Sequence, residues 1–175
     1  MLDPDRWIPT TVTQRTVWDE GLFTLHLAEV RSFEPGQFVK LAATTEQGDV
    51  SRAYSIASAP GRPLEFFIVR VDGGALTPHL DALRPGDPLH VGRAIVGGFT
   101  LAKIPADDAR ELWMVATGTG LAPYISMLRH GAVWDRFDRV VLVQGARTAS
   151  QLAYRVELEA IGRDRPLTWI GHTTR

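Results

Sequence analysis

Residues 51–60, S-R-A-Y-S-I-A-S-A-P, are the stretch of this sequence that indicates its fold and function most strongly. In a strand, successive side chains point to opposite faces, so Arg52 and Tyr54 share one face and Ser55 lies on the other. Arg52 can pair with a phosphate through its fork of N–H donors, and Tyr54 can pack on an aromatic ring system. Ser55 can donate a hydrogen bond to a ring heteroatom. These side chains suit a flat anionic ligand such as a flavin dinucleotide.

A second informative stretch is L-W-M-V-A-T-G-T-G-L-A-P-Y-I-S-M-L, residues 112–128. Residues 112–116 form an apolar run typical of a buried strand, and a glycine-containing turn follows at 117–120. Residues 121–130 then favour a helix, with Pro123 in its first turn, where a missing N–H is tolerated. A strand, a glycine turn and a helix make a phosphate-binding layout, because free N–H groups and the helix dipole point at the turn. The full G-x-G-x-x-G spacing is absent, so a plain strand-to-helix turn remains the alternative.

Around the first stretch, residues 7 to about 100 have an all-β pattern. Short alternating or apolar runs predict strands over 12–17, 22–27, 38–41, 53–57, 64–71 and 89–92. Glycine or proline separates them, which favours a small closed antiparallel barrel. Residues 77–83 predict one short helix, capped by Thr77 with Pro78 at its first position.

The pattern changes at residues 104–108, which we interpret as a linker. Strands at 112–116, 140–144 and 167–170 then alternate with helices at 121–130 and 150–161, an order typical of a parallel sheet. The sequence therefore predicts two domains, an antiparallel β-barrel over residues 1–104 and a partial α/β parallel-sheet domain over residues 105–175.

Composition narrows the function classes further. The chain has 175 residues, of which 45% are hydrophobic, and a net charge of −1, which argues against nucleic-acid or polybasic membrane binding. No apolar stretch is long enough to span a bilayer, and the acidic start lacks a signal-peptide pattern, so we expect a cytoplasmic protein. We also expect it to be a monomer. The absence of cysteine excludes disulfides and iron–sulfur clusters held by this chain. The histidines are scattered, so we expect no metal site; they are His26, His79, His90, His130 and His172.

Taken together, the motifs resemble the ferredoxin–NADP reductase family, and its bacterial flavodoxin/ferredoxin reductases in particular. The resemblance covers nearly the whole chain. It rests on these segments in order: Pro35-Gly36-Gln37-Phe38, Arg52-Ala53-Tyr54-Ser55, Gly73-Gly74-Ala75-Leu76-Thr77-Pro78, Pro85-Gly86-Asp87, Gly98-Phe99-Thr100-Leu101, Thr117-Gly118-Thr119-Gly120-Leu121-Ala122-Pro123, Gln144-Gly145-Ala146-Arg147 and Gln151-Leu152-Ala153-Tyr154.

The resemblance implies a flavoprotein oxidoreductase that transfers electrons between NADP(H) and ferredoxin or flavodoxin, through hydride transfer to flavin N5. It implies FAD and NADP(H) as cofactors. Ser55, near N5, and Tyr54, against the flavin ring, would be the nearest to catalytic residues. The cofactor-binding residues it implies are Arg52, Ala53, Tyr54, Ser55, Phe67, Gly74, Ala75, Leu76 and Thr77 for the flavin, and Thr117, Gly118, Thr119, Gly120, Ala146, Arg147, Thr174 and Arg175 for the nicotinamide nucleotide.

Arg147 and Arg175 have support from the pattern as well as from the resemblance. They follow the second and third strands of the predicted parallel sheet, where ligands of such sheets gather, and two arginines there would suit the extra phosphate of NADP.

Each site residue has a structural alternative. Arg52 could instead form an ion pair with a carboxylate such as Glu65, Tyr54 could pack in the barrel, and Ser55 could bond to backbone. Phe67 could be a core residue, and Arg147 and Arg175 could be merely exposed.

The function has alternatives too. They are a related reductase with another acceptor, and a flavin-binding electron-transfer module that no longer uses NADPH. FMN in place of FAD also stays open, because the adenine side has no signature here. The family's second domain continues with two further strands and a tail, whereas this sequence stops after the third strand. We therefore expect a fragment or a reduced form whose second half is less stable than the barrel or leans on a partner.

Overall fold

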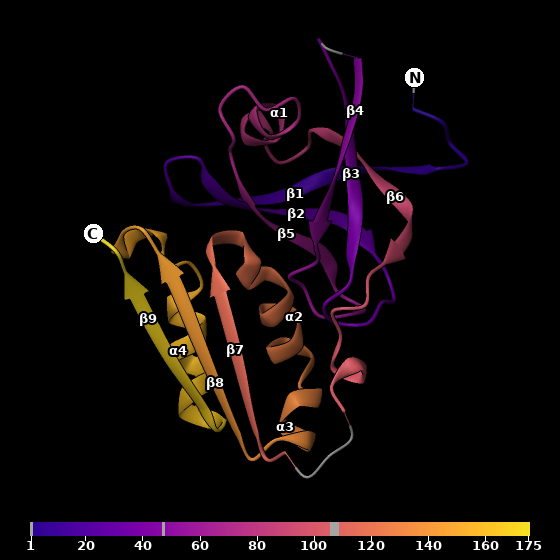
Figure 1. Ribbon diagram of the computed structural model, residues 1–175. Helices are drawn as coiled ribbons and strands as arrows, with labels where there is room; N and C mark the ends of the chain where they lie inside the picture. Colours follow the sequence, from indigo (N-terminus) through magenta and orange to yellow (C-terminus); the bar gives the residue numbers. More distant parts are fainter. Residues whose placement is uncertain (1, 47, 106–108) are drawn as a thin grey trace.

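The computed structural model describes residues 2–46, 48–105 and 109–175, which form two adjacent bodies (Figure 1). The first contains six antiparallel strands: β1 (Trp7–Asp19), β2 (Leu22–Val30), β3 (Phe38–Thr45), β4 (Gly48–Ser55), β5 (Pro63–Val69) and β6 (Pro88–Val96). They pair in the order β4-β3-β6-β1-β2-β5. A single bridge between Ile56, just after β4, and Phe66 of β5 brings the two outer strands together. The predicted antiparallel barrel is confirmed.

Alternating apolar side chains explain why these segments are strands, although the other face of β2 is also buried, because Leu22 packs in the junction with the second body. Phe23, Leu25 and Leu27 alternate along β2 and are fully buried, as are Val39 and Leu41 on β3. Burying each such side chain contributes about 1.5–3 kcal/mol, which is ample to fix which face of a strand points inward. Most strands extend beyond their predicted ends because strand edges carry little hydrophobic signal, but β4 ends at Ser55 and β5 at Val69, each two residues before its predicted end.

The short helix α1 (Thr77–Ala82) forms as predicted, but its predicted cap is wrong. The residue that precedes the helix is Leu76, and none of the described side chains caps the helix. The Thr77 hydroxyl instead accepts a hydrogen bond from the Val71 N–H at 2.9 Å and donates one to the Val71 carbonyl at 3.3 Å. The tight turn after β5 returns the chain to Val71, so this hydroxyl closes the loop rather than capping the helix.

The second body holds a three-stranded parallel sheet, in the order β7-β8-β9. Its elements are η1 (Leu101–Lys103), β7 (Glu111–Thr117), η2 (Gly118–Leu121), α2 (Ala122–His130), α3 (Ala132–Arg136), β8 (Arg139–Ala146), η3 (Ala149–Gln151), α4 (Arg155–Asp164) and β9 (Leu167–Thr173). The predicted parallel sheet is confirmed, while part of the predicted linker, residues 106–108, lies outside the described residues.

Two helix predictions need correction. The helix predicted over 150–161 begins only at Arg155, because Tyr154 has φ of +61° and cannot continue a right-handed helix. The sequence also gave no indication of α3, which starts directly after Gly131 ends α2 in the left-handed conformation. Within the described residues, no helix has both the length and the apolar character that crossing a membrane would need.

The two bodies share a core at their junction. Leu22, Ala57 and Phe67 of the barrel pack into the same buried cluster as the side chains of α2, α4 and the parallel sheet. The opposite face of that sheet is not covered at β7, where Trp113 and Val115 are 57% and 63% exposed. The second body is therefore anchored on its barrel side and open on the outer face of β7.

Candidate functional site

The predicted flavin motif lies on β4, and the pairing of β4 with β3 orients its side chains. Arg52 lies opposite Leu41 and Tyr54 opposite Val39. Directly paired residues share a face of the sheet, so Arg52 and Tyr54 lie on one face and Ser55 on the other. This is the arrangement that the alternating pattern predicts.

Arg52 is exposed, and its guanidinium donates only to the neighbouring Ser51 carbonyl, at 2.7 Å, within the described part of the chain. The alternative of an ion pair with Glu65 is wrong, because that carboxylate binds Arg129 and Tyr154. Arg52 therefore keeps donors that can pair with an external anion.

Tyr54 is half-buried and meets Phe66 edge-on, with ring centroids 6.5 Å apart. Burial raises the pKa of Tyr54 to about 12, against the opposing charge of Arg52. The phenol stays neutral at physiological pH, and the ring can serve as a platform for a flat ligand. The Ser55 hydroxyl forms no hydrogen bond to the described residues, so its donor is available as well.

The loop between β5 and α1 borders a hollow of about 420 Å³, lined by Thr45, Glu46, Gly73, Gly74, Ala75, Pro78 and His79. Gly74 is packed tightly, because a Cβ there would lie 2.9 Å from the Val71 carbonyl oxygen. The N–H groups of Ala75, Leu76 and Thr77 make no turn or cap hydrogen bond within the described residues. Free N–H groups beside a hollow suit an anionic group.

The predicted nicotinamide loop, Thr117 to Gly120, leaves the carboxyl end of β7 as the 3₁₀ turn η2, directly before α2. The η2 turn packs beside β5 of the barrel, which places it at the junction of the two bodies. Thr117, Gly118 and Gly120 are exposed, and Thr119 is half-buried.

The other predicted nucleotide residues gather at the carboxyl ends of β8 and β9. The Thr174 N–H donates to the Ala146 carbonyl at 3.2 Å, and the Arg175 N–H donates to the Arg147 carbonyl at 3.0 Å. Both arginine side chains are exposed and have no ion-pair partner among the described residues. The two cations are thus held on neighbouring strands.

Phe67 follows its core alternative. Its side chain is 3% exposed and packs edge-on against Tyr154, with centroids 5.3 Å apart, inside the junction. The ring is covered by protein, because β5 turns this face toward the second body rather than toward solvent. Phe67 thus contributes to the packing between the two bodies.

Sequence reasoning missed a buried polar cluster at the junction, formed by Glu65, Arg129 and Tyr154. A signal was present: Glu65 interrupts the apolar run L-E-F-F-I-V of β5, at a position that the strand buries to 4% exposure. A carboxylate buried to that extent requires a partner, but the partner lies 64 residues away and no local pattern identifies it.

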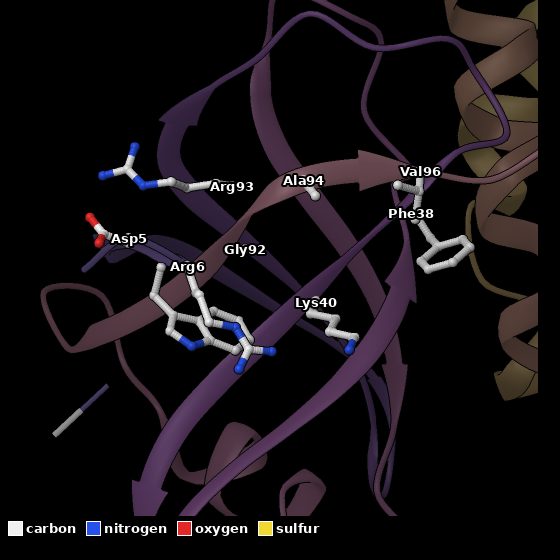
Figure 2. A pocket seen from close by; sticks show the side chains of 9 residues that line it. Asp5, Arg6, Phe38, Lys40, Gly92, Arg93, Ala94 and Val96 are labelled. Atoms are coloured by element: carbon white, nitrogen blue, oxygen red, sulfur yellow. The ribbon is translucent and has the colours of Figure 1, made fainter. Parts of the chain in front are cut away.

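A further hollow of about 390 Å³ lies on the outer wall of the barrel, and Figure 2 shows its lining. Arg93 extends away from Arg6 and Lys40, and its Nε donates to the Pro4 carbonyl at 3.0 Å. None of the predicted cofactor residues lines this hollow. Among the described residues, no group of three histidine, cysteine, aspartate or glutamate side chains could hold a metal ion.

Comparison with protein families matches both bodies. Residues 9–97 match the oxidoreductase FAD-binding domain, and residues 114–174 match the oxidoreductase NAD-binding domain. The first match covers the barrel and the flavin motif, and the second covers the parallel sheet and the nicotinamide loop.

Individual relatives agree with this assignment. The flavodoxin/ferredoxin–NADP reductase of Escherichia coli is 43% identical over 150 residues, which are 85% of this chain and 60% of that protein. The ferredoxin–NADP reductase of Azotobacter vinelandii is 40% identical, over 79% of this chain and 54% of that protein. The crystal structure of a ferredoxin NADP⁺ reductase from Neisseria gonorrhoeae with bound FAD and NADP superposes with a TM-score of 0.89 at 26% identity, covering 97% of this chain and 69% of that one. The chain thus spans 60% or less of these two curated relatives.

Proposed function

The chain belongs to the flavodoxin/ferredoxin–NADP reductase family, and from this premise we propose that it transfers electrons between NADP(H) and ferredoxin or flavodoxin through bound FAD. The division proposed is a flavin domain over residues 1–104 and a nucleotide domain over residues 105–175. The observation that carries the proposal is the exposed guanidinium of Arg52, which donates only to the Ser51 carbonyl within the described residues, on the same face of β4 as the Tyr54 ring.

The residues of the barrel fit FAD in three respects. Arg52 offers a fork of donors to the pyrophosphate. The N–H of Ala75, which makes no turn or cap hydrogen bond to the described residues, borders a hollow that suits the same anion, and the N–H groups of Leu76 and Thr77 follow it in the chain. Tyr54 offers a neutral aromatic face to the isoalloxazine. Gly74 keeps the loop compact enough for its backbone to reach the ligand.

The second domain supplies the nicotinamide nucleotide site. The Thr117–Gly120 turn lies at the carboxyl end of β7 and at the junction, where parallel sheets bind nucleotides. Arg147 and Arg175, at the next two strand ends, offer two cations that have no ion-pair partner in the described part of the chain. That charge fits the additional ribose phosphate of NADP(H), whereas a carboxylate would fit NAD(H).

FAD, when bound, supplies the hydride and single-electron chemistry, and the chain supplies binding, orientation and exclusion of water. Ser55 has a free hydroxyl that can donate to a ring heteroatom of the flavin, and Tyr54 supports the ring from its own face of β4. Thr119, on the opposite side of the junction, borders the nicotinamide. No side chain needs to act as a general acid or base, so rate depends on how closely the two rings are held.

The test is a coupled assay with the FAD-loaded chain, NADPH and either reduced-carrier detection or cytochrome c as terminal acceptor. We expect cytochrome c reduction to rise in proportion to added ferredoxin or flavodoxin. A rate that is independent of both carriers, and that rises only with added free flavin, would contradict the carrier assignment.

A further inference from the structure

A buried carboxylate of the barrel is held by side chains of the other domain. Glu65 of β5 is 4% exposed. Its Oε2 accepts a hydrogen bond from Arg129 of α2, and its Oε1 accepts one from the Tyr154 hydroxyl at 2.8 Å. Both hydrogen-bond donors come from the nucleotide domain, whereas on the barrel side His26 of β2 places its Nδ1 3.9 Å from Oε2. The hydrogen bonds from Arg129 and Tyr154 to Glu65 therefore form only when the two domains are together.

Arg129 spreads its guanidinium over three partners. Its Nε and one terminal nitrogen donate to the two oxygens of Glu157 on α4, at 2.6 and 2.8 Å, and the other terminal nitrogen also donates to the Ala57 carbonyl at 3.0 Å. Burial by itself would lower the pKa of Arg129, but the bonds to Glu157 and the charge of Glu65 outweigh it and raise the pKa. Arg129 is therefore a permanent cation that joins α2, α4 and the barrel.

Tyr154 completes the cluster at a backbone position that disfavours a bulky residue. Its φ of +61° lies in the left-handed region, which an L-residue other than glycine adopts only when its surroundings compensate. Its ring lies against Trp18, with centroids 4.9 Å apart, and the Trp18 indole N–H donates to Thr24 at 2.7 Å. The single phenolic proton goes to Glu65, so the Thr24 hydroxyl, 3.1 Å away, donates to Tyr154.

The cluster connects directly to both cofactor segments. Ala57, whose carbonyl Arg129 holds, comes two residues after Ser55, and Ser126 of α2 donates to the next carbonyl, that of Ser58, at 2.7 Å. The helix that carries Arg129 begins immediately after the Thr117–Gly120 turn. The helix α2 thus follows the nucleotide turn at its start, and near its end Arg129 and Ser126 bind the carbonyls of Ala57 and Ser58, just after β4.

We propose that Arg129, Glu65 and Tyr154 are positioning residues that fix the nucleotide turn against the flavin strand. This inference rests on the proposed function. In that reaction a hydride leaves NADPH, which is oxidised to NADP⁺, and reduces the flavin. A displacement of about 1 Å between reacting groups can slow such a step about 100-fold. The cluster therefore sets the limiting rate of flavin reduction and leaves FAD affinity unaltered.

The test uses three variants of similar side-chain size. Arg129→Lys removes the forked guanidinium, Glu65→Gln removes the carboxylate charge, and Tyr154→Phe removes the phenolic hydroxyl. The matched control is Arg110→Lys. Arg110 also makes a forked pair, with Asp138 at 2.7 and 3.0 Å, but this pair is exposed and lies within the nucleotide domain.

The first measurement is stopped-flow reduction of bound FAD at saturating NADPH. We expect the limiting rate to fall about 10- to 100-fold in Arg129→Lys, while FAD affinity and reduction by dithionite stay at the wild-type level. In the double variant Arg129→Lys/Tyr154→Phe, the limiting rate should fall by less than the product of the two single-variant factors, because both residues act through Glu65. A limiting rate within twofold of wild type in all three variants would overturn the proposal.

The second measurement, amide hydrogen exchange of the FAD-loaded chain, needs no turnover. We expect faster exchange in residues 56–58 and 121–130 of Arg129→Lys and Glu65→Gln, and no change in Arg110→Lys. Unchanged exchange in both cluster variants would overturn the proposal. If wild-type FAD is not reduced by NADPH, the proposed function fails, and this exchange result still decides whether the cluster joins the domains.

Discussion

Replacing Arg52 by alanine tests the flavin site where the structure is most specific. The guanidinium is exposed and makes one hydrogen bond to the described residues, with the Ser51 carbonyl, so its loss should change the stability of the protein by less than about 0.5 kcal/mol. Its hydrogen bonds to a phosphate would be charge-assisted and worth about 1.5–3 kcal/mol in total. We therefore expect the Kd for FAD to rise about 10- to 150-fold.

The assay is a titration of the FAD-free chain with FAD, followed by flavin fluorescence, at fixed ionic strength. Arg52→Lys should give an intermediate Kd, because it keeps the charge and loses the fork. Arg155→Ala is the control, since Arg155 is 62% exposed on α4 and pairs only with Glu159 within the described residues. A Kd for Arg52→Ala within twofold of wild type would refute the pyrophosphate role.

Three further substitutions probe the junction and the nucleotide site. Tyr154→Phe should lower the free energy of unfolding by about 1–3 kcal/mol at pH 8, measured by urea denaturation. Burial and Glu65 raise the pKa of Tyr154 in the folded state, so wild-type stability should be complete below pH ~10 and fall by up to about 1.4 kcal/mol per pH unit above it. Tyr154→Phe should lack the loss of stability that Tyr154 ionisation causes above pH ~10. An identical fall in the free energy of unfolding of wild type and variant at alkaline pH would contradict this reasoning. Gly36→Ala should cost about 3 kcal/mol, because φ is +101° and the new Cβ would lie 1.8 Å from the Phe99 carbonyl oxygen; an unchanged melting temperature would show that the close approach is absent. Arg147→Ala should raise the KM for NADPH and leave that for NADH alone, and equal effects on both would refute the phosphate assignment.

The fold could be predicted from the sequence wherever the signal is local. Alternation of apolar and polar residues around Phe23, Leu25 and Leu27 identifies a barrel strand, and the order of strands and helices after residue 111 identifies a parallel sheet. The face shared by Arg52 and Tyr54 follows from the period of two alone. Signals of this kind depend on neighbours in sequence, and the sequence contains all of them.

What could not be predicted depends on contacts between distant segments. The Thr77 hydroxyl bonds to the backbone of Val71, which the loop brings close to it, and does not cap the helix that begins at Thr77. The late start of α4 follows from the left-handed conformation of Tyr154, which its contacts with Glu65, Trp18 and Phe67 compensate. Phe67 lies in the interdomain core because it packs against Tyr154, a contact that no neighbour in sequence indicates.

The most direct test of the account is an anaerobic titration of the FAD-loaded chain with NADPH, recorded in the visible spectrum. The account predicts that the yellow flavin band bleaches, with about one NADPH consumed per FAD, since a hydride carries the two electrons that reduce one flavin. A chain that holds FAD and stays yellow with excess NADPH, yet bleaches with dithionite, would contradict the account. It would identify the protein as a flavin-binding electron-transfer module that does not use NADPH.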